Sequence, residues 1–223
     1  MMGFQVSSTL THNYSLMKHS SNAESKIRVE EWLPGDSLVD ASRAAAIEAD
    51  LDMLAEVLQA VVHGGASVSF FTPFSTNEAR GFWREKVLPG VHAGTRRVVV
   101  ARDGGRIVGT VQLQLEMPPN QQHRAEVAKL LVHPDARRRG IAKSLMTALE
   151  EIAISEGRTL LTLDTVTGSG AESLYRKLGY ITVGVVPRYA RGALTTDLES
   201  TTIMYKELVD RKSLIDHDLR FTI

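Results

Sequence analysis

Apolar residues recur along the chain with two different periods, which separate predicted strands from predicted helices. Alternating or short continuous apolar runs predict seven strands, over residues 27–32, 97–101, 106–115, 125–132, 159–163, 181–186 and 201–208. Helical spacing predicts three helices, over residues 40–62, 141–156 and 171–178. In the first helix, Leu51, Leu54 and Leu58 share one stripe, which we expect to face the core.

One more helix is predicted from its first turn. Ser75 and Glu78 have the spacing of a capping box, in which each side chain accepts a hydrogen bond from the other's backbone amide. Phe82 and Trp83 follow as apolar positions, and Pro89-Gly90 marks the expected end. The chain therefore reads as strand, two helices, three strands, helix, strand, helix and two strands. This order predicts an α/β fold with a mixed sheet and no internal repeat.

The 223 residues suffice for one buried core but not for two ordinary domains with a linker. We predict a single domain over residues 27–208. Residues 1–26 are rich in Ser, Thr and Asn, lack the apolar stretch of a secretory signal, and are expected to be a disordered tail. A transit peptide is the alternative, but the segment contains no Arg. Residues 209–223 carry alternating charges and are expected to form a peripheral extension.

Composition excludes several classes of function. Twenty-six basic and 26 acidic residues give a net charge of zero, so no overall field attracts nucleic acid or an anionic membrane. The absence of Cys excludes disulfides, thiolate nucleophiles and Cys-based zinc sites. The His residues also lack metal-ligand spacing. No apolar run is long enough to span a membrane. We therefore expect a cytoplasmic protein that binds neither nucleic acid, membrane nor metal.

The sharpest motif lies between a predicted strand and a predicted helix. There, Leu130-Leu131-Val132 is followed by His133-Pro134 and then by three consecutive arginines, Gly140 and Ala142. The first amides of a helix lack partners and carry partial positive charge, so they can bind a phosphate. Small residues at Gly140 and Ala142 leave room for the anion, and the arginines add charge and forked hydrogen bonds. The motif predicts a phosphate-binding turn from Arg137 to Lys143.

Three competing roles for this motif fit the residues less well. The arginines can simply form a solvated helix end, but the complete order of strand, proline, basic run, glycine and helix favours a ligand site. A dinucleotide-binding turn lacks its Gly-x-Gly-x-x-Gly pattern here, and a P-loop lacks its Gly-Lys-Ser/Thr.

The run Arg137-x-x-Gly140-x-Ala142 resembles the acetyl-CoA signature of the GNAT N-acetyltransferase superfamily, and the element order resembles that fold. The resemblance covers about residues 27–208. Within the superfamily, residues 62–70, 124–140, 160–165 and 184–189 are similar to antibiotic-acetylating members of the tabtoxin-resistance type. The resemblance implies a mixed, mostly antiparallel sheet with a splayed central strand pair and flanking helices.

The resemblance also implies acetyl-CoA as co-substrate and no metal. The backbone that would pair with the pantetheine arm belongs to Leu130, Leu131 and Val132. The pyrophosphate would be wrapped by Arg137, Arg138, Arg139, Gly140, Ile141, Ala142 and Lys143. Many members also hold the pantetheine with an asparagine ahead of the next helix, whereas this chain has Gly168-Ser169-Gly170. Ser169 is the expected substitute.

Acetyl transfer to an amine requires a neutral nucleophile and a proton for the leaving thiolate. Glu126 on the cofactor strand and Asp164 after a buried strand are the candidate bases. Each can also have a structural role: Glu126 can pair with Arg124 or Lys129, and Asp164 can cap the following turn.

Tyr175 matches the tyrosine that many GNAT members place at the CoA sulfur, so it is the candidate acid, although it can also be a core aromatic. Tyr180 is expected to be core. His63, in a Gly-Gly turn, and Tyr189 are candidates for the substrate side.

We expect an enzyme that acetylates a primary amine of a small molecule, such as an amino-acid-like or β-lactam antibiotic. Acetylation of a protein lysine or amino terminus is the alternative, and a non-catalytic acetyl-CoA sensor is less favoured because it needs none of the three candidate catalytic side chains. The sequence leaves a homodimer open.

Overall fold

A seven-stranded sheet forms the centre of the computed structural model, which describes residues 27–34 and 41–208. The strand order is β1-β2-β3-β4-β5-β7-β6. All neighbouring strands are antiparallel except β4 and β5, which are parallel. This confirms the predicted fold class. The strands are β1 (Arg28–Glu31), β2 (Arg96–Asp103), β3 (Arg106–Gln114), β4 (Arg124–Val132), β5 (Leu160–Val166), β6 (Ile181–Arg191) and β7 (Leu198–Glu207).

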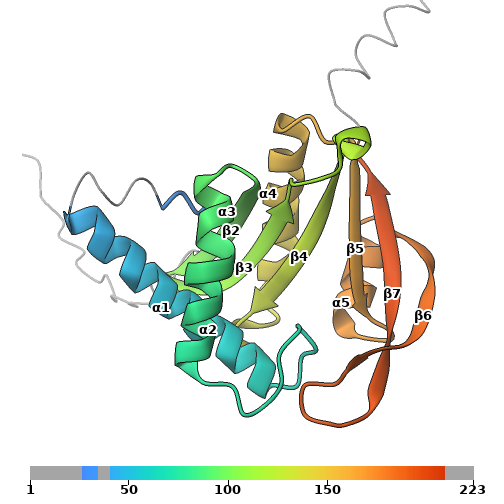
Figure 1. Ribbon diagram of the computed structural model, residues 1–223, viewed down its shortest axis with the longest axis horizontal. Coiled ribbons are helices and arrows are strands. Elements are labelled where there is room, and N and C mark those ends of the chain that lie inside the picture. Colours follow the sequence, from blue (N-terminus) through green and yellow to red (C-terminus); the bar gives the residue numbers. More distant parts are fainter. Residues whose placement is uncertain (1–26, 35–40, 209–223) are drawn as a thin grey trace, which may run out of the picture.

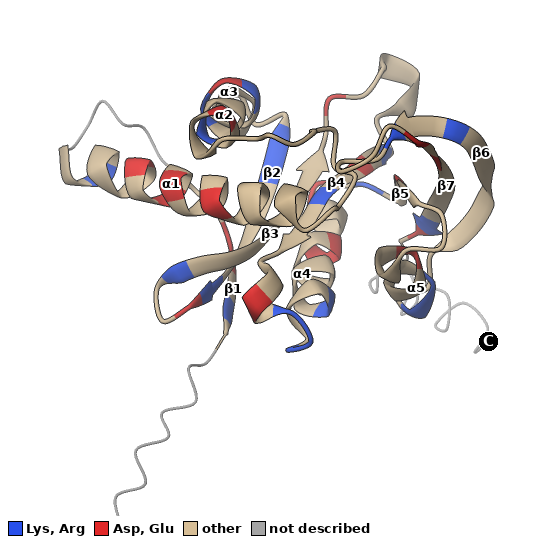
Figure 2. Cartoon of the chain, turned by 90° about the horizontal axis from the view of Figure 1, so that it is seen from below, with Lys and Arg blue, Asp and Glu red and all other residues tan. Residues whose placement is uncertain are grey.

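Helices cover both faces of the sheet. They are α1 (Ala41–His63), α2 (Thr76–Phe82), the π-helical turn η1 (Trp83–Val87), α3 (Leu88–His92), α4 (Ile141–Ser155) and α5 (Gly170–Lys177). Two single 3₁₀ turns, η2 (Pro119–Gln121) and η3 (Pro134–Ala136), flank β4. Helices α1, α2 and α3 lie on one face, and α4 and α5 lie on the other (Figures 1 and 2).

Most predicted elements are present, with shifted ends. The capping box at Ser75 and Glu78 starts α2 as expected. The predicted end near Pro89-Gly90 is two residues early, because the helical path continues through η1 and α3 to His92. Pro89 lies in the first turn of α3, where a missing amide hydrogen is tolerated. Strand β6 runs to Arg191, five residues beyond its predicted end at Val186. The predicted tail 1–26 and extension 209–223 lie outside the described residues.

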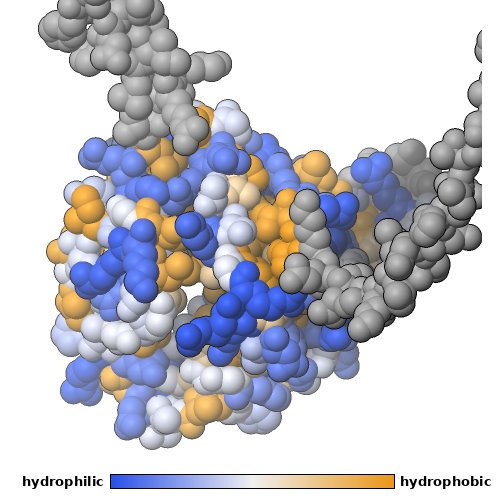
Figure 3. All heavy atoms as spheres, turned by 180° about the vertical axis from the view of Figure 1, so that it is seen from behind, coloured by the Kyte–Doolittle hydropathy of each residue, from blue (hydrophilic) through white to orange (hydrophobic). Residues whose placement is uncertain are grey.

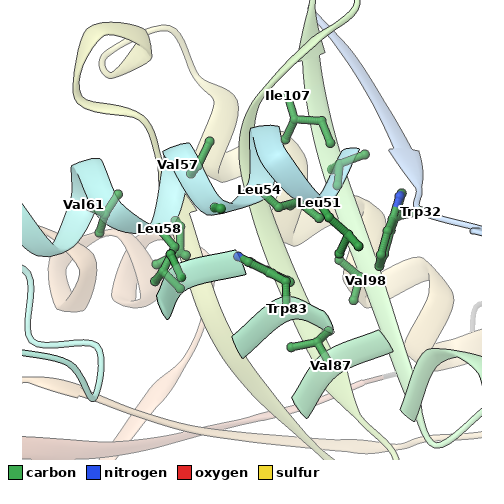
Figure 4. Packing of buried hydrophobic residues seen from close by; sticks show 14 of the residues in the cluster. Trp32, Leu51, Leu54, Val57, Leu58, Val61, Trp83, Val87, Val98 and Ile107 are labelled. Atoms are coloured by element: carbon green, nitrogen blue, oxygen red, sulfur yellow. The ribbon is translucent and has the colours of Figure 1, made fainter. Parts of the chain in front are cut away.

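Two apolar clusters fill the space on the two sides of the sheet. The first joins α1 and η1 to the sheet, with Leu54, Leu58 and Trp83 fully buried (Figure 4). The second packs α4 and α5 against the other face through residues such as Leu145, Leu149 and Met204. The helical stripe read from Leu51, Leu54 and Leu58 is therefore core, as predicted.

The sheet opens between its two central strands. Parallel pairing of β4 with β5 is limited to three residue pairs, from Arg124 opposite Leu160 to Glu126 opposite Thr162. Beyond Glu126 the two strands diverge, as Figure 1 shows. On the other side of β4, its register against β3 shifts between Ala128 and Leu131, so β4 contains one extra residue there. Lys129, in this bulge, has a left-handed backbone with φ 52°. A β-bulge bends its strand, which is consistent with this divergence.

Candidate functional site

A cavity of about 770 Å³ occupies the opening between β4 and β5. Its wall is built by residues 65–71 after α1, residues 126–132 of β4, the start of α4, the segment from the end of β5 into α5, and facing parts of β6 and β7. The lining therefore comes from elements on both faces of the sheet. Figure 3, which views the molecule from behind, shows hydrophilic side chains gathered around a hollow in that face. The site is a cleft through the sheet.

The turn before α4 has the geometry of an anion site. Arg138 and Gly140 both have positive φ, 65° and 77°, and Gly140 is the N-cap of α4. The helix begins with the bond from the Ser144 amide to the Gly140 carbonyl, so the amides just before Ser144 have no acceptor within the helix. Arg137, Arg138 and Ala142 line the cavity. A phosphate at its edge would meet these amides and two guanidinium groups.

The other residues predicted for this turn lie around it. Arg139 forms an ion pair with Asp103 at 2.6 Å and does not line the cavity. The Ile141 side chain is buried in the second cluster, and Lys143 is exposed. For Gly140 and Ile141, the predicted contact with the cofactor therefore depends on the backbone of the turn. For Arg139 and Lys143, it depends on the backbone or on the positive charge of the side chain.

Strand β4 presents unpaired backbone to the cavity. Leu130, Leu131 and Val132 all line it, although the Leu131 side chain itself is 1% exposed and packs in the first cluster. No described strand pairs with β4 on its β5 side after Glu126. Backbone donors and acceptors in a protein interior need partners. An amide-bearing ligand arm lying along β4 would supply them.

All three predicted catalytic side chains reach the same cavity. Glu126, Asp164 and Tyr175 line it, from β4, β5 and α5 respectively. The Asp164 carboxylate accepts a hydrogen bond of 3.0 Å from the Thr201 hydroxyl. The alternative structural pairings of Glu126 are not formed among the described residues: Arg124 donates to Gln121 and Thr162. Lys129 donates to Val68 and Ser69.

Burial determines the protonation state of Tyr175. The residue is 6% exposed, and loss of solvent, reinforced by the negative charge of Asp164, raises the pKa of its phenol. The phenol therefore stays protonated throughout the neutral range and can donate a hydrogen bond into the cavity, but cannot act as a base there. Tyr180 is 3% exposed and packs against Tyr175 with ring centroids 5.6 Å apart, which agrees with its predicted core role.

The remaining predicted residues divide between the cavity and its surroundings. Ser169 lines the cavity, although its hydroxyl also caps α5 by accepting from the Glu172 amide. Tyr189 lies on the rim and is 55% exposed. The structure does not bring His63 to the cavity: its Nε2 lies 3.0 Å from the Phe74 carbonyl, at the end of α1.

Sequence reasoning missed Lys129 as a cavity residue. Its ammonium lies 2.9 Å from the Val68 carbonyl and near the Phe70 and Phe82 rings. Desolvation lowers the pKa of this ammonium. A lysine inside an otherwise apolar strand segment was the available signal. Its direction depends on the bulge, which no local pattern revealed.

The described part of the chain holds no group of three or more His, Asp or Glu arranged to bind a metal. Among the described helices, none is both long enough and apolar enough to cross a membrane.

The chain is similar in sequence to known proteins. A model of the acetyltransferase (GNAT) family matches residues 66–180, which include the phosphate turn, Glu126, Asp164 and Tyr175. A segment of 89 residues, 38% of the chain, is 37% identical to N-acetyltransferase 8 of Rattus norvegicus. The chain spans only 39% of that relative's length.

Solved structures share the fold over most of the chain. An N-acetyltransferase from Staphylococcus aureus Mu50 superposes with a TM-score of 0.65 at 16% identity, over 83% of this chain and 100% of that one. The protein yncA of Salmonella typhimurium, solved with its cofactor acetyl-CoA, superposes with a TM-score of 0.61 at 16% identity. That match covers 83% of this chain and 95% of the other. At these identities the likeness concerns the fold.

Gly140 and Gly157 allow a matched test of the turn. They lie at opposite ends of α4, have φ of 77° and 71°, and have open space where a Cβ would stand. Gly140→Val and Gly157→Val should each cost about 1–3 kcal/mol of folding free energy through backbone strain. Gly140→Val alone should weaken CoA binding, by about 10- to 100-fold, because it crowds the anion. Calorimetric titration with CoA and thermal unfolding check both effects; equal affinities in the two variants would contradict the assigned turn.

Proposed function

Because the chain belongs to the acetyltransferase (GNAT) family, we propose that it transfers the acetyl group of acetyl-CoA to a primary amine of a small molecule. One observation carries the proposal. The unpaired backbone of β4, the N-terminus of α4 and the side chains of Glu126, Asp164 and Tyr175 all meet at a single cavity. The groups that would bind the cofactor and the groups that would carry out the transfer therefore line the same cavity.

The cofactor would lie along β4 with its pyrophosphate at α4. Amides of residues 140–143 would bind the diphosphate, and Arg137 and Arg138 would add positive charge beside it. The pantetheine amides would pair with the backbone of Leu130 to Val132, with Ser169 on the opposite wall. This orientation would direct the thioester toward the narrow end of the opening, where β4 and β5 begin to diverge.

The transfer would proceed by direct attack. Glu126 or Asp164 would take a proton from the acceptor ammonium, so that the neutral nitrogen can attack the thioester carbonyl carbon. A tetrahedral intermediate would form and collapse, breaking the carbon–sulfur bond. Tyr175, kept protonated by burial, would donate its hydrogen to the departing sulfur. The second proton of the nitrogen would restore the phenol, directly or through water.

The lining of the cavity favours a small acceptor. Residues 65–71 and Tyr189 to Arg191 both line the cavity and contact each other, since the Ser67 hydroxyl lies 3.4 Å from the Arg191 carbonyl, so an extended peptide would have to displace them. The similarity to antibiotic-acetylating members of the tabtoxin-resistance type points in the same direction and stays a prediction. Acetylation of a protein lysine or amino terminus is the second candidate, because the rim residue Tyr189 is exposed.

Release of CoA thiol separates these candidates. We expect purified protein to release thiol from acetyl-CoA when it is mixed with members of a panel of small primary amines, faster than with lysine-containing peptides or peptides with free amino termini. Mass spectrometry of the acceptor should show one added acetyl group. Acetylation confined to peptides would establish the second candidate instead. CoA binding without any transfer would indicate a sensor.

Tyr175 and Tyr180 provide a matched pair for the acid. Tyr175→Phe should reduce kcat about a hundredfold or more, because the leaving thiolate loses its proton donor. Its affinity for CoA should stay close to that of the unaltered protein. Tyr180→Phe, whose ring is buried next to it, should retain most activity. Steady-state kinetics and calorimetry measure the two quantities. Parallel losses of kcat and CoA affinity in Tyr175→Phe would assign it a structural role.

The two carboxylates can be distinguished by pH dependence. A variant without the base must rely on acceptor that is already deprotonated, so its kcat/KM should rise about tenfold per pH unit below the amine pKa of about 10.4. The test measures kcat/KM for Glu126→Gln, Asp164→Asn and the unaltered protein across pH 6–9. The base is the residue whose replacement produces this steep rise, whereas the other variant should follow the profile of the unaltered protein. Identical profiles for all three proteins would exclude both residues as the base.

A further inference from the structure

Lys129 is aimed into the cavity by the bulge of β4. Side chains of a regular strand alternate between the two faces, so residues 127, 129 and 131 would share one face. In this protein Val127 packs in the second cluster and Leu131 in the first, on opposite faces of the sheet. The extra residue at Lys129 causes this switch. A non-glycine residue in the left-handed region costs free energy and persists where the surrounding structure holds it there.

The ammonium of Lys129 is surrounded by neutral groups. It donates to the Val68 carbonyl at 2.9 Å and to the Ser69 hydroxyl at 3.1 Å. The Phe70 and Phe82 ring centroids lie 5.7 and 5.9 Å away. No carboxylate of a described residue forms an ion pair with it. Lys129 thus holds a largely desolvated cation that has two hydrogen bonds and no counter-ion.

Charges of both signs lie near this end of the cavity. Asp164 acts electrostatically on Lys129 from beyond ion-pair distance and favours its charged form, whereas desolvation and the nearby Arg96 oppose it. Arg96 is itself desolvated and donates to the side-chain carbonyl of Gln112 at 3.3 Å, on the strand that pairs with β4. The carboxylates Glu126 and Asp164 line the same cavity as Lys129. The cavity is therefore lined by the partly buried ammonium of Lys129 and by carboxylates of the opposite charge.

A partly buried cation without an ion-pair partner favours an anionic group as its ligand. Bringing a carboxylate to Lys129 would replace lost solvation with a charge-assisted hydrogen bond in surroundings of low polarity, where such bonds are strong. The same ligand could keep its amine at Glu126 or Asp164. A molecule with an amine and a carboxylate a few bonds apart matches this arrangement of charges.

We propose that Lys129 determines acceptor specificity by binding a carboxylate of the acceptor, so that the enzyme acts on amino acids or amino-acid-like amines. The assignment rests on the proposed acetyl transfer and narrows its substrate class. Lys129 contacts the acceptor but takes no part in the bond changes, since acetyl transfer needs only the amine, the thioester and the proton carriers described above. The two hydrogen bonds to Val68 and Ser69 hold its ammonium in place beside the cavity.

A purely structural role makes a different prediction. If Lys129 only fastens residues 65–71 to β4 through Val68 and Ser69, its loss should loosen the cavity wall and affect every acceptor equally. If it binds a carboxylate, its loss should affect only acceptors that carry one. Acceptor pairs that differ in this group alone separate the two roles.

The experiment uses α-amino acids and their α-carboxamides as paired acceptors, with thiol release as the measurement. The unaltered protein should have a higher kcat/KM for the acids than for the amides. Lys129→Met, which keeps most of the length of the side chain but not its charge, should lower kcat/KM for the acids by about 10- to 100-fold, mainly through KM, and leave the amides unchanged. Lys129→Arg should retain part of the preference. Lys177→Met, an exposed lysine on α5, is the control and should change neither.

Three outcomes would overturn the assignment. The first is an unaltered protein that uses acids and amides equally or prefers the amides. The second is a Lys129→Met variant that loses activity toward both in proportion. The third is a protein that acetylates other primary amines but neither member of any pair. The proposed function is judged separately, because its failure would appear as the absence of acetyl transfer to every amine tested.

Discussion

The early end of the pairing between β4 and β5 is the constraint on which the candidate site depends. Three residue pairs hold the strands together, and beyond Glu126 the backbone of β4 has no neighbouring described strand on that side. The bulge at Lys129 adds a residue where the strands diverge. An unpaired strand edge inside a protein is unfavourable unless a ligand or water satisfies it. The opening therefore provides space for a ligand and leaves backbone groups that a ligand could satisfy with hydrogen bonds.

Loss of solvent acts on two side chains of the cavity in opposite directions. It raises the pKa of the Tyr175 phenol and lowers that of the Lys129 ammonium, because in each case burial disfavours the charged form. For the phenol the result is a dependable hydrogen donor. For the lysine the result is an ammonium group that a bound anionic group would stabilise. One physical cause thus shifts the pKa values of two side chains that line the same cavity.

Sequence patterns predicted the structural features that depend on residues close to one another along the chain. The capping box at Ser75 and the seven strands are local, and the structure contains them. The turn from Arg137 to Lys143 is local too and leads into α4, while its binding of phosphate stays a prediction. That Glu126 and Asp164 meet at one cavity required the strand order, which the family resemblance supplied. The bulge at Lys129 was not predictable, because a single added residue leaves no periodic signal. His63 was misplaced because a glycine turn does not reveal the direction of the side chain before it.

The cleft passes through the sheet, so different elements shape its two sides. The turn before α4 and the edge of β4 line one part of the cleft, whereas residues 65–71 and parts of β6 and β7 line another. Insertions or substitutions in the latter segments leave the helix start and the strand edge untouched. Under the proposed acetyl transfer, changes in these segments would therefore alter which amine is accepted and leave the donor site in place.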